Sequence, residues 1–254
     1  MSFIAIVPAR AASSRLPDKP LLDIGGLPMV VRTARQAARS RAERVIVATD
    51  DARVQAAARE HGIEAVLTRG DHPTGTDRLA EVCQQLTLAP DRIVVNVQGD
   101  EPLIEPGYID KVAAALEKDA SAAIATCAAP ISRQDTLFNP NAVKVVCTAD
   151  RRALYFSRAP IPWARDALAG GAHVLAPGLP ALHHIGLYAY RAAFLLGFPS
   201  LPVGPLETFE CLEQLRALEN GHAITVQQVD ALPAPGVDTP EDLAHIRALF
   251  ANRL

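Results

Sequence analysis

The chain has 254 residues, enough for one large domain or one with a small appendage, and its 49% hydrophobic and 21% charged residues are typical of a globular protein. The formal net charge of −3 argues against a nucleic-acid partner, which usually needs a strongly basic face. No apolar run is long enough to span a bilayer, and the short one at the amino terminus lacks the preceding cation of a signal peptide, so we expect no membrane partner. The four cysteines form no C-x-x-C pair, which argues against a zinc site or a disulfide framework and favours a cytoplasmic protein.

The amino-terminal segment combines a strand pattern with a basic loop. Residues 2–7 are predicted to form a buried strand, because a short apolar run ends at a proline. The loop after it carries Arg10, Arg15 and Lys19. Ligands bind at the carboxyl ends of strands in open α/β sheets, and these cations suit a polyphosphate. The alternative is a solvated basic loop with no ligand.

Strand and helix patterns then alternate. Strands are predicted at 44–49, 64–67, 92–97, 142–147, 184–190 and 223–228. Helices are predicted at 29–39, 52–61, 77–88, 107–118 and 206–220, with a last one opening at 239–242 and a loop over 167–180. This alternation predicts an α/β fold with a mostly parallel, mixed sheet and helices on both faces.

Two aspartates are candidate metal ligands. Asp100 follows the strand at 92–97 and a glycine, and Asp238 precedes the last helix. Mg²⁺ takes oxygen ligands, usually one or two carboxylates together with substrate phosphates. The alternatives are a turn at Asp100 and helix-end chemistry at Asp238.

A cluster of hydroxyls, a glycine and a cation precedes the helix predicted at 77–88. Thr74, Gly75 and Thr76 could present backbone N–H groups and hydroxyls to an anion, and Arg78 would add a positive charge. The alternative is an ordinary helix cap at one of the threonines.

Further polar residues have spacings that place them together. His184 and Tyr188 share a face of a predicted strand, and Glu207, Glu210 and Gln214 share a face of the predicted helix at 206–220. With Arg158 they suit a hydroxyl-rich acidic ligand, although each could be structural. The chain lacks the P-loop, G-x-G-x-x-G and G-x-S-x-G motifs, which argues against a P-loop NTPase, a dinucleotide-dependent oxidoreductase and an α/β-hydrolase.

These motifs, taken in order along almost the whole chain, resemble the sugar-acid cytidylyltransferases. The matching blocks are PAR at 8–10, SRLPDKPL at 14–21, IVATD at 46–50, NVQGDEP at 96–102, NPNAVK at 139–144, YFSR at 155–158, HIGLY at 184–188, LEQLR at 212–216 and GVDTPED at 236–242. The resemblance is strongest to the branch that uses 3-deoxy-manno-octulosonate. Residues 12–15 lack the glycine-rich loop with a lysine of the sialic-acid branch.

The resemblance implies a nucleotide-diphospho-sugar transferase (Rossmann-like) fold over 1–254, with a less regular sugar-binding and dimerisation portion within about 130–220. It implies CMP transfer from CTP to the anomeric hydroxyl of 3-deoxy-D-manno-octulosonate, a 2-keto sugar acid, in a Mg²⁺-dependent cytoplasmic homodimer of lipopolysaccharide synthesis. The implied CTP-binding residues are Arg10, Arg15, Lys19, Thr74, Gly75, Thr76 and Arg78. The implied sugar-acid residues are Gln98, Arg158, His184, Tyr188, Glu207, Glu210 and Gln214. The implied catalytic residues are Lys19, Asp100 and Asp238, of which the two aspartates would bind the metal.

Three alternatives remain at this point. The chain could activate another sugar acid, such as a sialic or 8-amino analogue. It could be a glycosyltransferase of similar fold, although Gly99-Asp100-Glu101 matches a D-x-D metal motif only in part. It could also bind a nucleotide as a regulator without catalysing a reaction.

Overall fold

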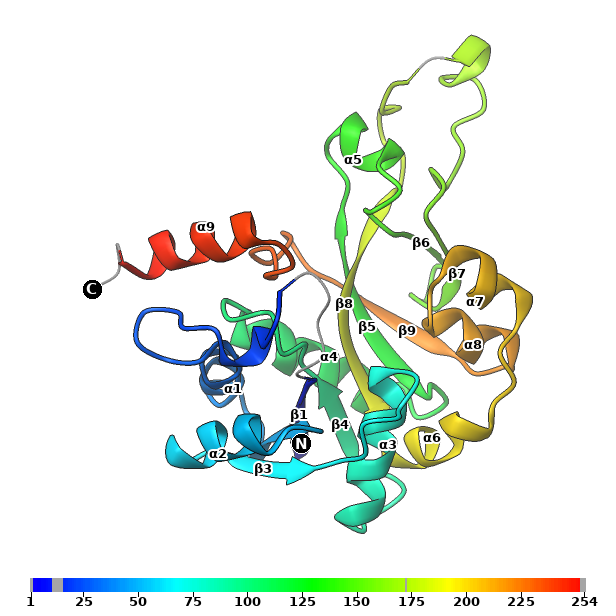
Figure 1. Ribbon diagram of the computed structural model, residues 1–254. Helices are drawn as coiled ribbons and strands as arrows, with labels where there is room; N and C mark the ends of the chain where they lie inside the picture. Colours follow the sequence, from blue (N-terminus) through cyan, green and yellow to red (C-terminus); the bar gives the residue numbers. More distant parts are fainter. Residues whose placement is uncertain (1, 11–15, 172, 252–254) are drawn as a thin grey trace. The chain divides into compact units, whose positions relative to one another are not determined.

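The computed structural model describes residues 2–10, 16–171 and 173–251, which form two compact units (Figure 1). The first unit is drawn from Met1–Ala114, Ala189–Pro199 and Pro233–Leu254. The second is drawn from Ala115–Tyr188 and Ser200–Leu232. The single domain predicted over 1–254 stays a prediction.

The first unit contains a parallel sheet of four strands in the order β3-β2-β1-β4. These strands are β1 (Phe3–Ala9), β2 (Arg44–Thr49), β3 (Glu64–Leu67) and β4 (Ile93–Asn96). Central β1 pairs with β2 on one side and β4 on the other, with Ile6 opposite both Ile46 and Asn96. Its near-continuous apolar sequence follows, because both faces of a central parallel strand are buried.

The helices of the first unit are α1 (Met29–Ala37), α2 (Ala52–Glu60), α3 (Gly75–Gln85), α4 (Pro106–Lys118), α6 (Ala192–Gly197) and α9 (Pro240–Ala251), with 3-10 turns η1 (Lys19–Leu21) and η3 (Phe198–Ser200). Helices α1, α2 and α3 connect the four strands, whereas most of α4, together with α6 and α9, belongs to the same unit without linking them. Helices α1 and α2 pack on each other and on β1 to β3, whereas α3 packs on α6. Right-handed crossovers place α3 on the face opposite α1 and α2, because the chain reverses direction across the sheet after β3.

The second unit is built on both parallel and antiparallel pairs. Its strands are β5 (Ile124–Pro130), β6 (Lys144–Cys147), β7 (Ala153–Ser157), most of β8 (Leu182–Arg191) and β9 (Ile224–Gln228). Its helices are α5 (Gln134–Phe138), α7 (Pro205–Glu210) and α8 (Gln214–Glu219), with the 3-10 turn η2 (Ala169–Gly171). Strand β5 is parallel to β9, whereas β6 is antiparallel to β7 and β8. A mostly parallel, mixed α/β architecture is therefore confirmed.

The prediction of one continuous helix at 206–220 is wrong, because the structure has two short helices there, α7 and α8. Cys211 adopts a left-handed backbone with φ 51°, which ends α7, and α8 begins only at Gln214. The apolar periodicity of the sequence continues across this break, so the periodicity gave no sign that the helix ends there. Strands β5 and β7 were not predicted from the sequence either. Within the described part of the chain, no helix is both long and apolar enough to cross a membrane.

Candidate functional site

The first unit contains a cavity of about 800 Å³ at the carboxyl ends of β1 and β4. The strand order runs outward from β1 to β2 and β3 on one side and to β4 on the other, so this is the point where α/β sheets bind ligands. The lining residues come from the β1 loop, the start of α3, the β4 loop and the start of α9. They are Pro8, Ala9, Arg10, Lys19, Pro20, His72, Pro73, Thr74, Gly75, Arg78, Gln98, Gly99, Asp100 and Asp238.

Lys19 brings the two predicted metal ligands together. Its Nζ lies 2.6 Å from Asp100 Oδ2 and 3.0 Å from Asp238 Oδ1. The Lys19 side chain is only 14% exposed, so this ammonium is largely shielded from water inside the cavity. Cation and carboxylates from three distant segments therefore converge at one end of the cavity.

The position of Asp238 follows from a backbone contact. The N–H of Val237 donates to the carbonyl of Asp100 at 2.9 Å, so the segment before α9 runs beside the loop after β4. Asp242 in the first turn of α9 accepts the backbone N–H groups of Asp238 and Thr239. These two hydrogen bonds lower the pKa of the Asp242 carboxyl, and the bond from the Asp238 N–H has the larger effect. The turn that presents Asp238 is thereby stabilised.

Gly99 allows the loop after β4 to approach β1. A Cβ built on Gly99 would lie 2.6 Å from the carbonyl oxygen of Pro8, closer than any side chain tolerates. The Gly99 carbonyl accepts the hydroxyl of Thr33 from α1 at 3.1 Å. The loop that carries Gln98 and Asp100 is thus fixed between β1 and α1.

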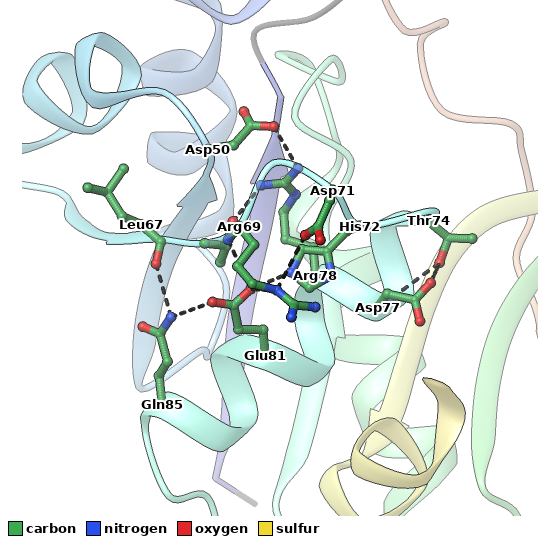
Figure 2. A network of polar contacts seen from close by, with 11 residues as sticks. Asp50, Leu67, Arg69, Asp71, His72, Thr74, Asp77, Arg78, Glu81 and Gln85 are labelled. Carbon is green, nitrogen blue, oxygen red and sulfur yellow. Dashed lines mark hydrogen bonds and ion pairs between the residues drawn. The ribbon is translucent and has the colours of Figure 1, made fainter. Parts of the chain in front are cut away.

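The start of α3 also lines the cavity, and Figure 2 shows Thr74 and Asp77 at this helix end. Thr74 caps the helix by accepting the N–H of Asp77 at 3.2 Å, which confirms the helix-cap alternative for this residue. Thr76 is buried. Gly75 has nothing within 4 Å of a built Cβ, so the backbone there is open.

Arg78 lies in a polar network that the sequence did not reveal (Figure 2). It is 4% exposed and donates to Asp50 Oδ2 at 2.9 Å and to the hydroxyl of Thr68. On the same helix, Glu81 binds the side chain of His72, another cavity residue. The only signal in the sequence was that Asp50 directly follows the strand predicted at 44–49.

The second unit gathers Arg158 and Glu210. The Glu210 carboxylate accepts the backbone N–H of Arg158 at 2.9 Å and the hydroxyls of Ser157 and Tyr155. Burial acts to raise the pKa of Glu210, but these hydrogen bonds outweigh it and the net pKa is lowered. The Arg158 guanidinium in turn donates to three carbonyls, those of Glu210, Pro140 and Cys211.

The other predicted sugar-acid residues of this unit occupy different environments. Glu207 binds Arg216 through two bonds of 2.6 and 2.7 Å, and both side chains are nearly buried. Glu207 and Glu210 both lie on α7, but the prediction that Gln214 shares their helix face is wrong, because α7 ends at Cys211 and Gln214 begins α8. Gln214 is buried, and its Nε2 has no hydrogen-bond partner within the described residues.

His184 and Tyr188 lie on β8. The ring of His184 is buried against Phe156 and Tyr188, and its Nε2 lies 2.9 Å from the Thr126 hydroxyl. Burial lowers the pKa of His184 to about 3, so the ring is neutral. Its role as a sugar-acid ligand stays a prediction, as does that of Tyr188.

Two further points concern the predicted ligands. Arg15 lies outside the described residues, whereas Arg10 lines the cavity. No group of three or more His, Cys, Asp or Glu side chains with metal-binding geometry occurs in the part of the chain that the structure describes. The carboxylate oxygens of Asp100 and Asp238 still fit Mg²⁺, which needs only one or two carboxylates when phosphate oxygens supply the other ligands.

Comparison with known proteins identifies the family. The cytidylyltransferase family profile matches residues 4–224. The chain belongs to the cytidylyltransferases. As a member of this family it is a nucleotidyltransferase. Residues Pro8 to Asp100 of the cavity fall within the matched region, and Asp238 lies beyond it.

Solved structures resemble the cytidylyltransferase over its full length. A structure of CMP:2-keto-3-deoxy-manno-octonic acid synthetase complexed with CTP is 41% identical, covers 100% of this chain and 99% of its own, and superposes with a TM-score of 0.89. A cytidylyltransferase from Leptospira borgpetersenii serovar Hardjo-bovis (strain JB197) is 15% identical over 100% of this chain and 87% of its own, with a TM-score of 0.60. The second likeness concerns the fold alone.

Proposed function

We propose that this cytidylyltransferase transfers CMP from CTP to the anomeric hydroxyl of 3-deoxy-D-manno-octulosonate and releases pyrophosphate. The observation that supports it most is the 41% identity, over the whole chain, with a synthetase of the CMP derivative of this sugar acid. The cavity supports it independently, because it combines cations, a helix amino terminus and paired carboxylates.

CTP would bind in the cavity of the first unit. Arg10 and Lys19 are the cations placed to neutralise the triphosphate. The open backbone at Gly75 gives an anion access to the N–H groups at the start of α3. Arg78 is already bound to Asp50 and Thr68, so it would act from a fixed orientation.

Asp100 and Asp238 are the residues that would bind Mg²⁺. The metal would supply charge neutralisation on the phosphates and would lower the pKa of the attacking hydroxyl. Lys19, which binds both carboxylates and lines the cavity, would exchange these contacts for phosphate oxygens when CTP enters.

The reaction is an in-line displacement at the α-phosphorus. The anomeric oxygen forms a bond to phosphorus while the bond to the β,γ-pyrophosphate breaks, and the hydroxyl proton passes to solvent. Such chemistry depends on positioning and on charge stabilisation more than on covalent participation. Arg10 and Lys19 would stabilise the charge that develops on the leaving pyrophosphate.

We assign recognition of the sugar acid to a set of residues in the second unit. Gln98 lines the cavity of the first unit, and its contact with the sugar acid stays a prediction. Gln214 carries the strongest local support, because a buried amide without a hydrogen-bond partner is costly unless a ligand accepts from it. Arg158 and Glu210 supply the charge and acceptor groups that a hydroxylated acid needs. His184, Tyr188 and Glu207 complete the proposed set. We further propose that the protein acts as a cytoplasmic homodimer in lipopolysaccharide synthesis.

A coupled pyrophosphate assay tests the activity. CTP, Mg²⁺ and 3-deoxy-D-manno-octulosonate should together give rapid release, and omission of any component should abolish it. Parallel reactions with sialic acid, the 8-amino analogue and UTP measure specificity. Faster turnover of another sugar acid would reassign the substrate, and CTP binding without release for any acceptor would contradict an enzymatic role.

A further inference from the structure

Asp18, the residue directly before Lys19, has a left-handed backbone. Its φ is 51° and its ψ is 30°, a conformation that is unfavourable for residues with a side chain. Strained backbone of this kind persists only where neighbouring contacts stabilise it, and it often occurs beside functional groups. The carbonyl of Asp18 accepts the N–H of Leu21 at 2.8 Å, so the strained residue begins the turn η1 that carries Lys19.

The Asp18 side chain does not cap this turn. It instead binds Arg53 of α2, whose Nη2 lies 2.7 Å from Oδ1 and whose Nη1 lies 3.3 Å from Oδ2. Arg53 is itself fixed by Asp51, which accepts the Arg53 backbone N–H at 2.7 Å and the side-chain Nη2 at 2.7 Å. Asp51, at the start of α2, therefore fixes the orientation of the Arg53 guanidinium that binds Asp18.

We propose that Arg53 is a positioning residue for Lys19. By binding Asp18, it stabilises the left-handed turn that directs the Lys19 ammonium toward Asp100 and Asp238. The inference rests on the proposed function in one respect, that Lys19 binds the triphosphate of CTP.

The pair acts on the population of the turn and not on global stability. Arg53 and Asp18 have side chains that are 60% and 49% exposed, and an exposed ion pair adds little to the free energy of unfolding. If only a fraction of the molecules has the turn in its binding-competent conformation, the apparent Kd for the ligand rises in inverse proportion to that fraction. Saturating CTP selects the competent turn, so the KM for CTP rises while kcat is unchanged.

Glycine at position 18 provides the decisive background, because glycine adopts this conformation without strain. We expect Arg53→Met to raise both the calorimetric Kd and the KM for CTP about fivefold, with kcat unchanged. In the Asp18→Gly background, Arg53→Met should have no further effect. Asp18→Ala, which keeps the strain and loses the ion pair, should weaken CTP binding at least as much as Arg53→Met.

A matched control comes from the same unit. Arg44 binds Glu64 through two bonds of 2.6 and 3.2 Å, and these side chains are 37% and 43% exposed. Arg44→Met should leave CTP binding unchanged. Lys19→Ala differs from the positioning variants because it should lower kcat.

Two results would overturn the inference: equal effects of Arg53→Met in the wild-type and Asp18→Gly backgrounds, or unchanged CTP affinity in Arg53→Met. Calorimetry with CTP and Mg²⁺ needs no sugar acid. If the wild-type protein binds CTP but does not use the octulosonate, the proposed substrate fails while this test remains decisive. If the wild-type protein does not bind CTP, the proposed function fails first.

Discussion

The ammonium of Lys19 lies 2.6 Å from the carboxylate of Asp100, although 81 residues separate the two in sequence. Both follow parallel strands that neighbour each other, β1 and β4, and the sheet therefore brings their loops together. Asp238 reaches the same ammonium from the segment before α9. The contact defines the end of the cavity where charge on a triphosphate would be neutralised.

Asp100→Asn should abolish most of the activity without unfolding the protein. The substitution keeps the shape of the side chain but removes the negative charge that a metal or Lys19 requires. We expect kcat to fall at least about 100-fold, as for loss of one transition-state contact. Because the side chain is 33% exposed, the free energy of unfolding should change little. Pyrophosphate release and urea unfolding measure the two quantities.

Asp110→Asn is the control for this variant, since Asp110 binds Arg41 and does not line the cavity. Its activity should match that of the wild-type protein. Near-normal turnover in Asp100→Asn would remove Asp100 from the catalytic set.

Gly99→Ala should damage both the fold and the activity. The new Cβ would meet the Pro8 carbonyl at 2.6 Å, and this atom belongs to a central strand that cannot move away. Forcing such a contact typically costs about 1–3 kcal/mol. We expect a lower melting temperature and a raised KM for CTP. Gly107→Ala, at the start of α4 with its nearest neighbour 3.9 Å away, should be tolerated.

The sequence predicted most of the first unit and only part of its site. Alternating apolar strands and helices are local signals, and β2 and β3 have the bounds expected from them. Asp100 and Lys19 could be proposed because both follow strands. The contact of Arg78 with Asp50 could not, because it joins residues 28 apart whose pairing depends on how α3 packs.

The second unit was harder to predict for a physical reason. Cys211 breaks the helix through a left-handed backbone, and nothing in the residue type signals this conformation. The spacing of Glu207, Glu210 and Gln214 therefore suggested one face where the structure has two short helices. Their separate partners, Arg216 for Glu207 and Arg158 for Glu210, follow from tertiary packing.

Arg216→Met should destabilise the protein by about 3 kcal/mol. It would leave the Glu207 carboxylate nearly buried without the two hydrogen bonds from Arg216. Replacing both residues, as Glu207→Gln with Arg216→Met, should recover much of the loss because no uncompensated charge remains. Urea unfolding of the two single variants and the double variant measures the coupling. Additive effects would show that the ion pair contributes nothing specific.

His184 should make stability depend on pH in the mildly acidic range. Burial lowers its pKa from 6.5 to about 3, so between these values the unfolded chain binds a proton that the folded chain does not. The free energy of unfolding therefore falls as the pH decreases below 6.5, by at most about 1.4 kcal/mol per pH unit. Between about pH 7.0 and pH 5.5 the His184 contribution amounts to about 1 kcal/mol.

His184→Gln removes this titration and keeps a group that can bond to Thr126. The wild-type protein should therefore lose about 1 kcal/mol more than His184→Gln between the two pH values in urea unfolding. Comparison of the two proteins cancels the titration of other groups that both share. His245→Gln, at an exposed histidine of α9, should behave as the wild-type protein does. Identical pH dependence in His184→Gln and wild type would show that the His184 ring takes up its proton as readily in the folded chain as in the unfolded one.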